Sequence, residues 1–266
     1  MDRPDTSPPT MIQRILDSDF VFDFIRAPLA MLAAAVVLFL FIIAILAPLV
    51  APTNPFDPAS LNLMNGFTPP MTPNMFTGQS FVMGTDDQGR DLLSAIIYGL
   101  RVSLFVGVMS VLLAMGIGVS LGLVAGYVGG WLDNLIMRIA DIQLTFPSIL
   151  IAMLIFGVLR GIIPPDLRDE MAIFVLIAAI GLSEWVPFAR TVRATTLVEK
   201  EKEYVQAARL IGLRRGQIMW RHILPNVIGP VLVIATITLA LAIIAEATLS
   251  FLGCLLYTSP SPRDEL

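Results

Sequence analysis

The chain has 266 residues, of which 56% are hydrophobic and only 14% are charged, with a formal net charge of −4 and a mean hydropathy of +0.80. Soluble domains carry roughly 25% charged residues, so this composition excludes an ordinary soluble globular protein. The single cysteine, Cys254, excludes an internal disulfide and a cysteine-based metal cluster.

Five charge-poor runs predict an all-α polytopic membrane protein. A spanning helix needs about 20 apolar residues to cross a hydrocarbon core of about 30 Å. In chain order, the predicted helices cover approximately residues 30–50, 103–126, 135–158, 171–188 and 226–247. Pro147 is expected to bend the third helix, because proline removes a backbone donor, and Glu184 is the one charge in the fourth.

These helices divide the chain into segments. The predicted segments are a cytoplasmic N-terminal tail (1–27), a first transmembrane helix (28–50), an external segment (51–98), a core membrane domain (99–253) that contains a basic loop (189–225), and a C-terminal tail (254–266).

The second helix carries a small residue at every fourth position. These residues are Ser110, Ala114, Gly118, Gly122 and Gly126. Such spacing lets another helix approach closely, so we predict tight packing along this face. The alternative is a face that lines a transport path or slides against a neighbour.

The distribution of basic residues predicts the orientation. Residues 189–225 contain eight Lys and Arg residues, whereas residues 51–98 contain only Arg90. The positive-inside rule therefore places the basic loop in the cytoplasm, the 51–98 segment outside and the N-terminus inside.

Within the basic loop, "EKEKEYVQAARLIG" predicts an amphipathic helix. Its expected apolar face is formed by Tyr204, Ala207, Ala208 and Ile211, and Gly212 occupies the position of a C-terminal cap. A second short amphipathic stretch, "RRGQIMWRHILPN", is expected to end at Pro225. The first helix could lie on the membrane surface or dock in a groove of a soluble partner, and charge does not decide between these uses.

The sequence "YVQAARLIG", followed by "HILPN", resembles the EAA loop of ABC-importer permeases. The residues that occupy this pattern are Tyr204, Gln206, Ala207, Ala208, Gly212, Leu224 and Pro225. Gln206 stands in place of the usual glutamate, and His222 in place of the usual isoleucine.

A second stretch narrows the resemblance. "MGTDDQGRDLLSAIIYGLRVSLFVG" is similar to the GTD-x-x-GRD segment of the dipeptide/oligopeptide/nickel permeases, with the motif residues Gly84, Thr85, Asp86, Gly89, Arg90 and Asp91. "DNLIMRIADIQLTFPSILIAM" and "EATLSFLG" resemble two further blocks of this family. The resemblance covers about residues 20–253 and is closest to the C-type transmembrane subunit.

The resemblance implies a type I ABC-importer transmembrane fold in a bacterial cytoplasmic (inner) membrane. The implied partners are ABC ATPase subunits, a second homologous permease, an external solute-binding protein and the lipid bilayer. The basic loop would couple the ATPase to the import of peptides or related small solutes. The family has six spans, so a chain with five, ending in "CLLYTSPSPRDEL" after Gly253, is expected to be truncated with a non-native tail.

The sequence contains no G-x-x-x-x-G-K-[ST] phosphate loop, so we predict a transport subunit that is not itself an enzyme. No cofactor, metal or nucleic acid is predicted. Two other interpretations are a stand-alone secondary transporter or channel whose loop lies on the membrane, and a membrane enzyme, for which we find no nucleophile–base pair or metal-ligand spacing. Glu246 is expected to be paired or to contact substrate, and Arg138 and Asp141 to form an ion pair within one helix.

Overall fold

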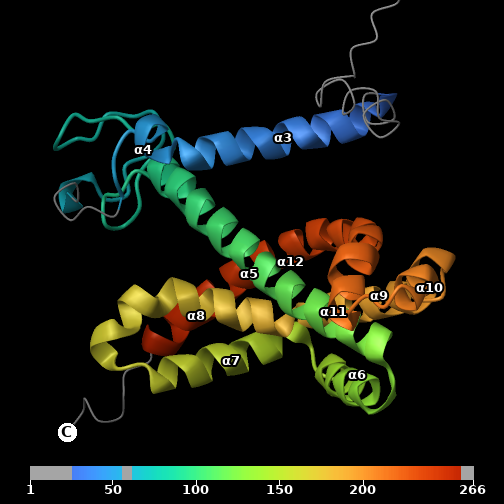
Figure 1. Cartoon of the computed structure of the whole chain (residues 1–266). Helices are drawn as coiled ribbons and strands as arrows, with labels where there is room; N and C mark the ends of the chain where they lie inside the picture. Colours follow the sequence, from blue (N-terminus) through green and yellow to red (C-terminus); the bar gives the residue numbers. More distant parts are fainter. Residues whose placement is uncertain (1–25, 56–61, 259–266) are drawn as a thin grey trace, which may run out of the picture. The chain divides into compact units, whose positions relative to one another are not determined.

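The computed structural model describes residues 26–55 and 62–258, and within these ranges it is almost entirely helical (Figure 1). The predictions for residues 1–25 and 259–266 lie outside the described part. The chain divides into two compact units, Met1–Arg101 and Val102–Leu266, and each is considered by itself. The described residues form isolated β-bridges but no strand, as the predicted fold class requires.

The first helix in the described part of the first unit is apolar on all sides. Helix α3 (Pro28–Ile45) is followed after Leu46 by the single turn α4 (Ala47–Val50), so the predicted continuous helix over 28–50 is broken. Pro48 explains the break, because its ring would clash with the carbonyl of Ala44 one turn earlier. A helix without a polar face, such as α3, is suited to a membrane.

Helix α5 (Leu92–Val128) is longer than predicted, and its small residues pack against helix α9 (Trp185–Glu199). A Cβ atom added at Gly118 would lie 2.5 Å from the carbonyl oxygen of Trp185, and one added at Gly122 would lie 2.4 Å from that of Ala189. The prediction of tight packing on this face is therefore confirmed.

The predicted third helix is two helices. Helices α6 (Gly130–Leu144) and α7 (Ser148–Ile162) are separated by a bend of 98°. The bend lies between Leu144 and Ser148 and includes Pro147. The predicted bend near Pro147 is therefore present, but it divides this segment into two helices rather than bending one continuous helix. Residues that precede proline avoid the helical region, and the proline itself cannot donate to the ladder, so the chain turns sharply here.

The predicted fourth helix is also broken. Helix α8 (Arg168–Ser183) meets α9 at Glu184 with a bend of 41°. Pro187 accounts for the position of this break, because its ring would clash with the carbonyl of Ser183. Helix α9 then continues to Glu199, so the first part of the predicted basic loop is helical. Helices α7 and α8 run side by side in Figure 1.

Gln143 links the two breaks. Its Nε2 donates to the carbonyl oxygens of Leu182 (3.1 Å) and Ser183 (2.9 Å), and its Oε1 accepts from the indole N–H of Trp185 (2.8 Å). The amide thus satisfies two carbonyls at the end of α8 that lack helical partners.

The chain then continues almost without interruption into a long last helix. The elements are α10 (Glu203–Leu210), α11 (Arg215–Ile218), a π-helical turn (Met219–Ile223) and α12 (Leu224–Thr258). The expectation that Pro225 stops a helix is wrong. Pro225 is the second residue of α12, and the π turn directly before it changes the hydrogen-bond register where proline has no N–H to donate.

Three described helices are long and apolar enough to cross a membrane, or five if each bent pair is one span. The upper number agrees with the five runs in the sequence. Ion pairs join α6 and α9: Arg193 forms a bidentate pair with Asp133, and Arg190 lies 3.4 Å from Asp141. The predicted pair between Arg138 and Asp141 is therefore wrong.

Candidate functional site: the loop around α10

Helix α10 is short, and one of its faces is buried in the chain. Val205 (0% exposed) and Ala208 (4%) pack into the core of the second unit. The predicted apolar face is thus only partly correct, because Ala207 and Ile211 are exposed. Ala208 is therefore unavailable to a partner, whereas Ala207 is accessible.

Gly212 ends α10 in the way that the sequence predicted. Its φ of +81° lies in the left-handed region that favours glycine. The N–H of Gly212 donates to the carbonyl of Arg209 (3.0 Å), and the N–H of Leu213 donates to that of Ala208 (3.2 Å). This pair of bonds is a Schellman motif, which closes the helix and turns the chain back towards α11.

Tyr204 ties α10 to the helices on either side of it. Its hydroxyl donates to the carboxylate of Glu199 (2.8 Å) at the end of α9 and accepts from Nδ2 of Asn226 (3.1 Å) at the start of α12. Lys202 Nζ donates to the other oxygen of Glu199 (2.7 Å). Partial burial and the neighbouring Glu199 raise the pKa of Tyr204 to about 12, so its hydroxyl keeps its proton at physiological pH.

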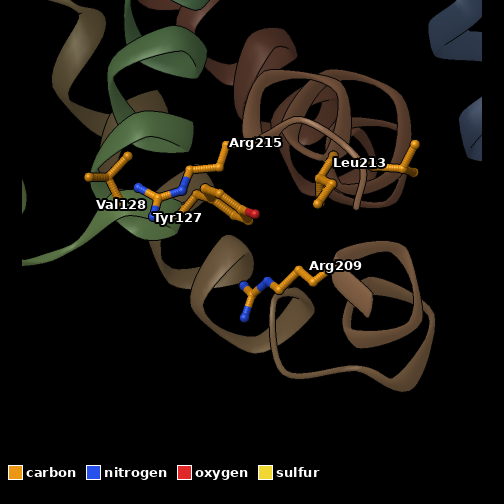
Figure 2. Close-up of a pocket in the computed structure, with 6 residues that line it drawn as sticks. Tyr127, Val128, Arg209, Leu213 and Arg215 are labelled. Atoms are coloured by element: carbon orange, nitrogen blue, oxygen red, sulfur yellow. The ribbon is translucent and has the colours of Figure 1, made fainter. Parts of the chain in front are cut away.

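Arg209 connects α10 to a third helix. Its guanidinium lies 5.2 Å from the ring centroid of Tyr127, near the end of α5, within reach of a cation–π interaction. Tyr127, Arg209, Leu213 and Arg215 are among the residues that line a cavity of about 390 Å³ at this junction (Figure 2). The loop is therefore attached to α5, α9 and α12.

The other predicted loop residues occupy different positions. Gln206 is exposed, and its Nε2 donates to the backbone carbonyl of Glu201 (2.9 Å). Leu224 packs against the core at the first position of α12, and Pro225 follows it. Sequence reasoning missed the contributions of Glu199, Asn226 and Tyr127. Only their nearness to the ends of predicted helices could have suggested them.

The predicted external motif lies in the first unit and forms a tight turn ahead of α5. Gly84 and Gly89 have φ values of +81° and +76°, and a Cβ atom at Gly89 would lie 2.1 Å from the carbonyl oxygen of Asn62. Glycine is therefore required there both by backbone conformation and by space. Thr85 Oγ1 accepts from the N–H of Thr68 (2.9 Å) and so fastens the turn to the preceding segment.

The charged residues of this motif hold the turn and start the helix. Asp86 accepts from the backbone N–H (2.8 Å) and Nε (2.6 Å) of Arg90 and from the N–H of Gln88 (3.0 Å). Burial raises the pKa of Asp86, but these hydrogen bonds outweigh it and hold the pKa below its ordinary value. Asp91 accepts from the N–H of Ser94 (3.0 Å), which makes it the N-cap of α5.

Two family models match parts of this chain. A family model described as a binding-protein-dependent transport system inner membrane component matches residues 118–259. A second, described as the N-terminal TM domain of oligopeptide transport permease C, matches residues 18–70.

Curated relatives match over most of the chain. The oligopeptide transport system permease protein OppC of Bacillus subtilis is 35% identical over 88% of this chain and 70% of its own length. The dipeptide transport system permease protein DppC of Haemophilus influenzae is 37% identical over 88% of this chain and 75% of its own. The glutathione transport system permease protein GsiD of Escherichia coli is 39% identical over 86% of this chain and 70% of its own.

The fold and the matches define a multi-pass inner-membrane permease. The chain belongs to the family of binding-protein-dependent transport system inner membrane components, the permease subunits of ABC importers. The resemblance found in the sequence is thereby confirmed. Among the described residues, no group of three or more His, Cys, Asp and Glu side chains could hold a metal ion.

Proposed function

We propose that this chain is the C-type permease of an importer for peptides or related small solutes, and that α10 couples it to a separate ATPase. The names of the relatives support the solute class, since they include oligopeptide, dipeptide and glutathione permeases. The nature of the family favours this role over a stand-alone transporter or a membrane enzyme.

The observation that carries the coupling role is the attachment of α10. The hydroxyl of Tyr204 joins it to α9 and α12, and Arg209 joins it to α5. A displacement of α10 would therefore move three helices together rather than bend a free loop. Rigid-body shifts of packed helices are a common basis for two-state transitions such as alternating access.

The outer face of α10 suits a partner. Glu203, Gln206, Ala207 and Leu210 are exposed, and Leu210 is 89% exposed. A small residue beside a large apolar one permits a helix to lie in a groove of another protein. In this proposal, partner ATPases hold the face from the cytoplasm and hydrolyse ATP, while a second permease and an external binding protein complete the importer.

The test introduces charge on the outer face. Ala207→Glu should reduce co-purification of the ATPase and solute uptake by at least about tenfold, which corresponds to 1.4 kcal/mol of lost binding. The permease should still fold, because Ala207 is exposed. Gln217→Glu is the matched control, since it adds the same charge to an exposed position on α11. Normal assembly and uptake with Ala207→Glu would refute the coupling role.

A further inference from the structure

A second cavity lies in the part of the molecule expected within the membrane. Its volume is about 210 Å³, and it is bounded by α7, by α12 and by the junction of α8 with α9. Its polar lining residues are Ser148, Ser183, Glu184 and Thr248, and the rest of its wall is aliphatic. The proposed coupling through α10 uses none of these residues.

Both helix breaks contribute to this cavity. Ser148 is the first residue of α7, directly after the break at Pro147, and Glu184 lies at the break between α8 and α9. Gln143 holds these breaks together through its bonds to the end of α8 and to Trp185. Irregular backbone at membrane depth is tolerated where it lines a cavity, and broken helices in transporters often form the solute site.

Among the described residues, the carboxylate of Glu184 forms no hydrogen bond and no ion pair, so this acid has no partner there. Glu184 is partly buried, and a more deeply buried acid of the spanning helices differs from it in having partners. Glu246 is 7% exposed and accepts from the hydroxyls of Ser103 (2.7 Å) and Ser250 (3.0 Å). An acid within a span is costly unless it is compensated, so the free carboxylate at Glu184 indicates a ligand.

The neighbouring hydroxyls add acceptors to the cavity. Ser183 Oγ donates its proton to the carbonyl of Ile180 (2.8 Å), and Thr248 Oγ1 donates to that of Ile244 (2.7 Å). Their hydrogens are thus used within their own helices, and only lone pairs remain for a ligand.

The partial charges at the neighbouring helix ends do not change the preference of this cavity for a cation. The end of α8 contributes a partial charge of about −0.5 and the start of α7 about +0.5, so the two offset each other and the carboxylate dominates. A cation with several N–H donors fits such a cavity.

We propose that Glu184 binds the primary ammonium group of the transported solute during its passage through the permease. This inference rests on the proposed function, in which the solute is a peptide or a related amine-bearing molecule. A cavity of about 210 Å³ suits the amino-terminal end of such a solute rather than its whole length. The carboxylate and the hydroxyl lone pairs would receive the three donors of the ammonium.

The transport test uses the complete importer in proteoliposomes with L-alanyl-L-alanine as the probe. Glu184→Gln should lower uptake about tenfold while ATP hydrolysis stimulated by the loaded binding protein changes less than twofold. Glu184→Asp should restore part of the uptake, and Glu170→Gln, an exposed acid outside this cavity, should behave as wild type. Unchanged uptake with Glu184→Gln would overturn the proposal.

A parallel loss of uptake, ATP hydrolysis and subunit assembly would also overturn it, because Glu184 would then be an ion-pair partner for the second permease. Ligand binding is measured separately by saturation-transfer NMR on the complete importer, with alaninamide and N-acetylalaninamide. Wild type should bind only alaninamide, and Glu184→Gln should bind neither. Equal signals from both compounds in wild type would refute ammonium recognition. If wild type imports no peptide, the proposed function fails, but the alaninamide signal still decides the role of Glu184.

Discussion

The contact between α5 and α9 predicts a large difference between two identical substitutions on one helix. A Cβ atom at Gly122 would lie 2.4 Å from the carbonyl oxygen of Ala189, and also 3.0 Å from the Cβ of Val192. Ordinary contact begins at 3.4 Å, so the two helices would have to separate by about 1 Å. At Gly116, on the same helix, a Cβ would meet nothing within 4 Å.

The magnitude follows from comparing Gly122→Ala with Gly116→Ala. Both substitutions gain up to about 1 kcal/mol of helix propensity, and this gain cancels in the comparison. What remains is the overpacking cost at Gly122, about 1–3 kcal/mol. Gly122→Ala should therefore unfold more easily than Gly116→Ala by this amount.

The assay is reversible unfolding of the purified permease in mixed micelles, followed by the loss of helical circular dichroism as the denaturing detergent increases. Solute uptake by the two variants in the assembled importer provides a functional comparison. Equal stability of the two variants would refute the close packing of α5 on α9.

Four other predictions concern individual hydrogen bonds. Asp91→Ala should destabilise the first unit by about 1 kcal/mol, because Ser94 loses its capping acceptor, and protease digestion should then cut that unit faster, whereas Asp91→Asn should not. Because the pKa of Asp86 is lowered in the folded chain, its stabilising contribution is present above its unfolded value, 3.8, and is lost as the pH falls through the folded value. The protection of amides against exchange in the turn before α5, relative to their intrinsic rates, should therefore fall under acid in wild type but not in Asp86→Asn. Tyr204→Phe should lower the free energy of unfolding by about 1–2 kcal/mol, because the hydrogen bonds of the hydroxyl are lost. It should also lower solute uptake relative to ATP hydrolysis. Wild-type stability should also decline between about pH 10 and 12, because the folded state holds the Tyr204 proton more tightly than the unfolded state. Circular dichroism across that range measures this decline, and a stability that does not change with pH would contradict the prediction.

The helices could be predicted because their main signals are local. A run of apolar residues and the four-residue spacing of Gly118 and Gly122 both persist whatever the rest of the chain does. The cap at Gly212 is equally local, since a left-handed residue after a short amphipathic helix favours glycine. These features depend on covalent geometry and on the solvent that surrounds each segment.

The orientation of α10 could not be predicted in the same way. The periodic pattern assigned Tyr204, Ala207 and Ala208 to one face, but the chain buries Val205 with Ala208 instead. A short helix with small residues has several faces of similar hydrophobicity. The tertiary partners available to it therefore select which face is buried.

The prolines show the boundary between the two kinds of information. The sequence indicates that Pro147 disturbs a helix, and the structure sets the size of the disturbance at 98°. At Pro225 the same residue type ends nothing, because a π turn precedes it.

The sequence by itself determined the apolar spans, their small-residue faces and the family pattern, because these are written in the order and spacing of neighbouring residues. Only the tertiary structure brought Tyr204 between Glu199 and Asn226 and placed Glu184 in a cavity among three helices. Contacts of this kind join residues far apart in the chain, and their geometry depends on how whole helices bend and pack.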